Sequence, residues 1–239
     1  MKTKKVKKTL KGNGKKNVKA ENKKTENIPV NKKDQNETQL VYVLVTILVV
    51  FGAFLGTYFF VQGLKTFEYA GVNFEKIDYQ NLELYHGVFP VVFNGQVKSY
   101  YNFYLRTDPR KNNIPINTDF SFSKNIVVSL SPEVGECVGA SLSQIELGKF
   151  LTAFGIANIK SAVTDPEIAK ELDVPYTTCN SASPEQTVII VQKSENPSID
   201  MESGSSFCYN INVGECENVK TIERFIVGIM AQINEVDIN

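Results

Sequence analysis

Residues 40–64 read LVYVLVTILVVFGAFLGTYFFVQGL, and no charged residue occurs between Thr38 and Leu64. As a helix rising 1.5 Å per residue, this stretch is about 37 Å long. A hydrocarbon core of roughly 30 Å needs about 20 residues. Many of the residues are β-branched, but a single segment in lipid satisfies its own backbone N–H and C=O groups only as a helix. The stretch therefore predicts one transmembrane helix, over residues 39–64.

The charges of the chain are divided by this apolar segment. Lys and Arg number 26, Asp and Glu also number 26, and the net charge is zero. Residues 1–38 hold 13 Lys against four acidic residues, a net +9, so the rest of the chain carries −9. Cytoplasmic flanks of membrane helices are rich in Lys and Arg. We therefore expect a single-pass cell-membrane protein with its N-terminus in the cytoplasm and residues 65–239 outside, not an ordinary soluble cytosolic protein.

A cleaved signal peptide is the competing interpretation of this segment. Signal peptides have apolar regions of about 7 to 15 residues, and the present one is far longer. Val61 and Gly63 form only a weak small-residue pair for cleavage. We therefore expect an uncleaved signal anchor. Gly52 and Gly56 form the pattern G-x-x-x-G, which lets two helices approach closely and so allows a homodimer. The alternative is that the two glycines only reflect how common Gly is in membrane helices.

Residues 1–38 are expected to form a disordered basic tail, because they contain almost no large apolar side chains. Lys residues next to the membrane attract anionic lipid headgroups by about 1 kcal/mol each, so the bilayer and these lipids are the expected partners. Binding to nucleic acid or to the ribosome is the alternative. The tail has no Arg and no aromatic residue for base stacking, so we do not expect nucleic acid as a partner.

All four cysteines follow the apolar segment, at Cys137, Cys179, Cys208 and Cys216. An even number on the expected outer side predicts two disulfides, for which three connectivities exist. The short loop between Cys208 and Cys216 favours that pair, which leaves Cys137 with Cys179. Zinc binding is the alternative, but no C-x-x-C spacing occurs and the only His, His86, is 51 residues from the nearest cysteine. We expect no metal site.

Residues 65–122 show the pattern of β-strands. The runs 87–93 and 97–106 flank Asn94-Gly95, a dipeptide typical of tight hairpin turns because both turn positions require φ > 0. Along the second run, one face carries Val97, Ser99, Tyr101, Phe103 and Leu105. This alternation predicts a half-buried strand in a hairpin.

Residues 123–239 mix the patterns of strands and helices. Three short apolar runs, 126–130, 187–192 and 206–213, are typical of buried strands. Ser143-x-x-Glu146 and Thr164-x-x-Glu167 have the capping-box pattern, which predicts that helices begin there.

Two longer helices are predicted from apolar residues at three- and four-residue spacing. A helix over 143–157 places on one face Ile145, Phe150, Leu151 and Phe154. A final helix over 218–233 aligns Val219, Ile222, Phe225, Ile226, Ile229 and Ile233. We expect the final helix to pack on a sheet, with an exposed face that docks a partner as the alternative.

These patterns predict an α+β fold, in which one transmembrane helix precedes an extracytoplasmic mixed α/β domain with a hairpin-rich N-terminal part. Residues 65–239 form either one such domain or two, 65–122 and 123–239.

The sequence contains no evident catalytic constellation. A hydrolase with a nucleophilic Ser or Cys needs an adjacent base, yet His86 is the sole His and no G-x-S-x-G occurs. The zinc-protease pattern H-E-x-x-H and the phosphate-binding pattern G-x-x-x-x-G-K-[ST] are also missing. We predict no catalytic or cofactor-binding residues. The expected function is a membrane-anchored binding or assembly module with a protein partner outside the cell. A carboxylate-dependent hydrolase and an accessory or sensor subunit of a membrane complex are the alternatives.

Four blocks after the apolar segment carry a resemblance. They are FEYAGVNFEKIDY (67–79), YNFYLRTDPRKNNIPI (101–116), TVIIVQKSENPSID (187–200) and CYNINVGECENVKTIERFIVGIMAQIN (208–234). With the basic tail and the single span, they resemble uncharacterised single-pass membrane proteins of small-genome archaea. The resemblance implies an archaeal cell-surface setting and no particular activity.

Overall fold

A computed structural model describes residues 32–93 and 96–238. The first element is the helix α1 (Lys32–Gly63). Its part Glu37–Gly63 has 27 residues and contains an 18-residue window with a mean hydropathy of 2.5, so it is long and apolar enough to cross a membrane, as predicted. The helix begins at Lys32, so residues 32–38 of the expected disordered tail are helical, because extending a formed helix costs far less than starting one. The rest of the predicted tail, residues 1–31, lies outside the described residues.

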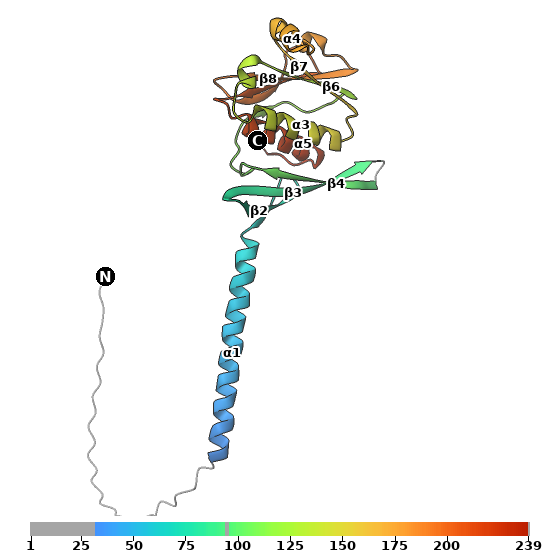
Figure 1. Ribbon diagram of the computed structural model, residues 1–239. Coiled ribbons are helices and arrows are strands. Elements are labelled where there is room, and N and C mark those ends of the chain that lie inside the picture. The colour runs from blue at the N-terminus through green and yellow to red at the C-terminus, as the bar shows by residue number, and fades with distance from the viewer. Residues whose placement is uncertain (1–31, 94–95, 239) are drawn as a thin grey trace, which may run out of the picture. The chain divides into compact units, whose positions relative to one another are not determined.

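The chain divides into two units at Phe54/Leu55. The second unit contains two β-sheets, and we call residues 66–238 the two-sheet domain. Its first sheet is antiparallel, in the order β1-β2-β3-β4 (Figure 1). The strands are β1 (Thr66–Tyr69), β2 (Val72–Tyr79), β3 (Leu82–Phe93) and β4 (Gln96–Leu105). The predicted pairing across Asn94-Gly95 is confirmed, although that dipeptide itself lies outside the described residues.

The second sheet has six strands in the order β5-β9-β10-β8-β6-β7. The strands are β5 (Ile116–Asn117), β6 (Asn125–Leu130), β7 (Asn158–Val163), β8 (Gln186–Lys193), β9 (Ser198–Met201) and β10 (Cys208–Val213). Strands β10, β8, β6 and β7 are parallel to one another. The three apolar runs predicted as strands form β6, β8 and β10. Continuous apolar runs fit these positions, because parallel strands are usually covered on both faces.

The helices of the domain form layers around this sheet. They are α2 (Pro132–Gly135), α3 (Ala140–Ala153), α4 (Pro166–Leu172), the short 3₁₀ helix η1 (Cys179–Ser181) and α5 (Asn218–Ile233). Helices α3 and α5 lie between the two sheets, whereas α4 lies on the other side of the six-stranded sheet (Figure 1). The α+β class predicted from the sequence is therefore confirmed.

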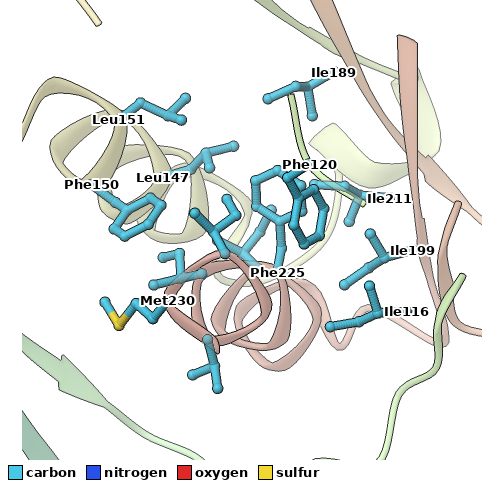
Figure 2. Close-up of a cluster of buried hydrophobic side chains, with 14 of the residues drawn as sticks. Ile116, Phe120, Leu147, Phe150, Leu151, Ile189, Ile199, Ile211, Phe225 and Met230 are labelled. Carbon is cyan, nitrogen blue, oxygen red and sulfur yellow. The ribbon is translucent and has the colours of Figure 1, made fainter. Parts of the chain in front are cut away.

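One hydrophobic cluster joins both sheets to the helices between them. Phe225 of α5 and Leu147 of α3 point toward Ile189 and Ile211 of the six-stranded sheet (Figure 2). Val72, Phe74 and Phe103 of the four-stranded sheet belong to the same cluster. Helix α5 coincides with the predicted range and is buried along residues 221–231. The expected packing of this helix on a sheet is confirmed, and a second sheet covers its other face.

The predicted start of α3 is wrong. The helix begins at Ala140, preceded by Gly139 with φ +90°, a conformation that favours glycine. Ser143 is therefore inside the first turn, where its hydroxyl donates to the Ala140 carbonyl at 2.8 Å instead of capping the helix. Ile145 is exposed and Leu147 is buried, because Leu147 lies three and four residues before Phe150 and Leu151 on one face, whereas the spacing of Ile145 places it off that face.

The predicted start of α4 is correct to within a residue or two. The helix begins at Pro166, and its N-cap is Asp165, one residue after Thr164. The Asp165 carboxylate accepts hydrogen bonds from the backbone N–H groups of Glu167 and Ile168, at 2.8 and 3.0 Å.

Candidate functional site

The outer half of the β3–β4 hairpin is a two-stranded ribbon. Pairing of β2 with β3 stops at Phe74 opposite Gly87, whereas pairing of β3 with β4 continues to Phe93 opposite Gln96. We call the described part of this ribbon, residues 88–92 and 96–102, the hairpin arm. Within the part of the chain that the structure describes, neither long edge of the arm has a neighbouring strand. A two-stranded hairpin is at best marginally stable alone in water.

The root of the arm is anchored on α3 by aromatic contacts. The rings of Phe89 and Phe154 lie 5.2 Å apart between centroids, and those of Tyr101 and Phe150 lie 6.0 Å apart. Farther out, Val92, Val97 and Tyr100 are 55%, 50% and 65% exposed. The arm thus presents apolar side chains to solvent beyond the part that the helices cover.

The face of the four-stranded sheet that points away from the core continues this exposed surface. It carries Tyr79, Leu82, Val88 and Tyr104 as exposed large side chains. His86 lies among them, with its ring stacked on that of Tyr104 at 4.7 Å and its Nε2 3.2 Å from the Asn102 Oδ1. Contiguous exposed apolar surface is typical of interaction sites. The sheet face and the arm are therefore the candidate interface.

A buried carboxyl group of helix α5 contacts the backbone at the end of β4, next to this interface. Glu223 is 5% exposed, and its carboxylate accepts hydrogen bonds from the backbone N–H groups of Arg106 at 2.5 Å and Thr107 at 3.0 Å, where β4 ends. Burial raises the pKa of Glu223 to about 7, although the hydrogen bonds from Arg106 and Thr107 act in the opposite direction. The next residue, Arg224, is also buried and donates to the carbonyls of Ile114 and Ile238.

All four cysteines form disulfides, as their even number predicted. Cys137 is joined to Cys216 and Cys179 to Cys208, with Cα–Cα distances of 5.2 and 5.5 Å. The predicted preference for Cys208 with Cys216 and Cys137 with Cys179 is therefore wrong. Cys208 begins β10 and Cys216 follows it, so the extended strand, rising about 3.3 Å per residue, keeps the two apart. Cys208 instead bonds to η1, and Cys216 bonds to the loop after α2.

The remaining predicted site residues do not come together with this interface. Gly52 and Gly56 lie on α1, where an added Cβ would meet no atom within 4 Å in the single chain. The contact between two such helices stays a prediction. Within residues 32–93 and 96–238, no group of three or more His, Cys, Asp and Glu side chains is placed to hold a metal ion.

No protein-family model, no curated protein and no solved structure matches this chain. The function must therefore be argued from the residues themselves, and the archaeal resemblance stays a prediction.

Proposed function

We propose that the chain is a single-pass cell-membrane protein that presents the two-sheet domain outside the cell as a binding or assembly module. The length and hydropathy of α1 support the span. The excess of Lys before it supports a cytoplasmic N-terminus, close to anionic lipid headgroups. The two disulfides support an oxidising compartment for the domain.

Titration of free thiols tests this placement. Protein extracted from membranes and denatured without reductant should contain no free thiol. Four free thiols would contradict an outer location, since thiols stay reduced in the cytoplasm. Protease added to intact cells should digest the domain and leave residues 1–31 protected.

The partner that we propose for the interface is a second copy of the chain, bound through the hairpin arm. The observation that carries this proposal is the unpaired ribbon, which exposes Val92, Val97 and Tyr100 beyond the helices. An uncovered strand edge is a template for pairing with another chain. Two antiparallel arms can pair about a two-fold axis, which gives a closed dimer. A parallel contact of two α1 helices through Gly52 and Gly56 would be compatible with such a dimer.

Sedimentation of the full chain in neutral detergent tests the dimer. The variant Val97→Ser/Tyr100→Ser removes two apolar contacts from each copy, each worth about 1 to 2 kcal/mol when buried, so the dissociation constant should rise by at least about 30-fold. Tyr176→Ser is the matched control, because Tyr176 is also an exposed tyrosine, at 52%, but follows α4 and lies outside the interface.

The proposal requires a wild-type dimer, weakened by the arm variant and unchanged by the control. A monomeric wild type, or equal effects of the arm and control variants, would overturn it. Crosslinking in intact membranes that joined the arm only to a different protein would also contradict self-association.

A further inference from the structure

The six-stranded sheet changes the direction of its connections at β6. This strand has β7 on one side and β8 on the other, both parallel to it. The chain passes from β6 to β7 through α3 on one face of the sheet, and from β7 to β8 through α4 on the opposite face (Figure 1). After β8 the chain continues to β9 and β10, which lie on the side of the sheet opposite to β7, so the loops after β6 and β8 diverge at the carboxyl edge. In open α/β sheets, ligands bind in the crevice at this position.

A crevice of about 1060 Å³ is present at this edge. Its walls follow the ends of four parallel strands, with Ser131 and Glu133 after β6, Thr164 after β7, residues 192–195 and Pro197 at and after β8, and Gly214, Glu215 and Glu217 after β10. The disulfide between Cys137 and Cys216 ties the loop after α2 to the loop after β10. Two walls of the crevice are therefore covalently linked, which favours a preformed site.

Ser131, which lines this crevice, has an unused hydrogen-bonding group. The residue is 8% exposed, and its backbone N–H donates to the Val191 carbonyl at 2.9 Å. Its hydroxyl is buried and has no hydrogen bond partner in the part of the chain that the structure describes. Such an unpaired group costs about 1 to 3 kcal/mol, so a ligand that bonds to it regains that energy.

The charges around the crevice select the ligand. Glu133, Glu195, Glu215 and Glu217 face a single cation on the lining, Lys193. Glu133 and Glu217 lie at the starts of α2 and α5, where the helix dipole offsets part of their charge, and Glu217 also contacts Lys220 at 2.9 Å. Glu195 and Glu215 lie on loops, and neither has an ion-pair partner among the described side chains. The excess negative charge disfavours phosphates and carboxylates and favours a cation.

We propose that this crevice binds a small organic amine. Its ammonium group is held by Glu195 and Glu215, and a polar group of the ligand forms a hydrogen bond with the Ser131 hydroxyl. All four carboxylates are exposed, which suits binding of a solvated ammonium more than general acid catalysis, for which carboxyl groups are typically buried. The proposal does not depend on self-association, because the arm belongs to the other sheet.

Titration calorimetry of the full chain in neutral detergent, with spermidine as the probe, tests this site. We expect saturable binding at one site per chain. Glu195→Gln/Glu215→Gln removes two charge-assisted contacts and should weaken binding by more than about tenfold. Ser131→Ala should weaken it by about five- to tenfold while leaving thermal stability unchanged or slightly higher. Glu171→Gln, an exposed carboxylate on α4 outside the crevice, is the matched control and should bind as the wild type does.

Four results would overturn the proposal. They are the absence of saturable binding, an equal loss in Glu171→Gln, complete displacement of spermidine by Mg²⁺ at matched ionic strength, and a loss of stability in Ser131→Ala. The second and third would show that spermidine acts only as a counterion. The fourth would show that the hydroxyl already has a partner within the protein.

Discussion

Raising the pH through neutrality should destabilise the two-sheet domain, because Glu223 must then carry a charge in a buried position. The pKa of this carboxyl is about 7 in the folded domain, against 4.5 for an ordinary Glu. The folded state therefore binds this proton more tightly than the unfolded chain. It follows that the free energy of unfolding falls between about pH 4.5 and 7 and stays lower above that range. The difference between the two pKa values corresponds to about 3 kcal/mol.

Glu223→Gln separates this effect from the titration of other groups. The amide has one acceptor oxygen, so the backbone N–H of Arg106 or of Thr107 loses its acceptor, at a cost of about 1 to 3 kcal/mol. The variant should therefore be less stable than the wild type near pH 5. The substituted side chain does not ionise, so the variant escapes the loss that the wild type suffers as the pH rises. Near pH 8 the free energy of unfolding of the variant, relative to that of the wild type, should therefore be about 3 kcal/mol more favourable than near pH 5.

Urea denaturation of the full chain in neutral detergent measures both profiles. Near-UV circular dichroism of the tyrosines can report unfolding, since the chain has no Trp. Glu171→Gln serves as the control, because its carboxylate is exposed, and its profile should follow that of the wild type. Parallel profiles of wild type and Glu223→Gln between pH 5 and 8 would refute the reasoning.

Two further predictions concern the packing of the domain. The disulfides are nested, with sequence separations of 79 and 29 residues, so the inner bond shortens the loop closed by the outer one to roughly 50 residues. Chain-entropy arguments then predict that Cys137→Ala/Cys216→Ala lowers the free energy of unfolding by about 4 kcal/mol, and that Cys179→Ala/Cys208→Ala lowers it by slightly less. Urea denaturation measures both losses, and unchanged stability in either variant would contradict the pairing. Gly228→Ala should lose about 1 to 3 kcal/mol, because its Cβ would meet the Ile116 Cδ1 at 2.5 Å. The control Gly148→Ala, with no atom within 4 Å of the added Cβ, should gain up to about 1 kcal/mol by helix propensity, and equal losses in both variants would exclude the close contact at Gly228.

Elements whose signals are local in sequence could be predicted well. The apolar run 187–192 forms most of β8, and the spacing of apolar residues predicted the exact range of α5. In both cases the residues that define the element are also those that fill its buried face. Alternation along β4 was less informative. It predicted one buried face throughout, but only Tyr101, Phe103 and Leu105 are covered, because the helices do not extend under the arm.

The crevice could not be predicted, because it depends on strand order. Ser131, Glu195 and Glu215 are far apart in the sequence and meet only because β6, β8 and β10 are parallel neighbours. The same order decides the disulfides, since it brings the loop after α2 next to the loop after β10. Local patterns identify individual strands but contain no information about which strands become neighbours. A search for short motifs would therefore miss both features.

Glu223 and Arg224 show a second limit of sequence patterns. By the amphipathic pattern of α5, these charged residues belong to the solvent face of the helix, yet the four-stranded sheet covers them. The Glu223 carboxylate bonds to backbone N–H groups, and Arg224 bonds to two backbone carbonyls. Every residue type except proline supplies both groups, so such partners leave no trace in the sequence. The side chain expected to set the pH response therefore cannot be recognised from the sequence, although the limits of its helix can.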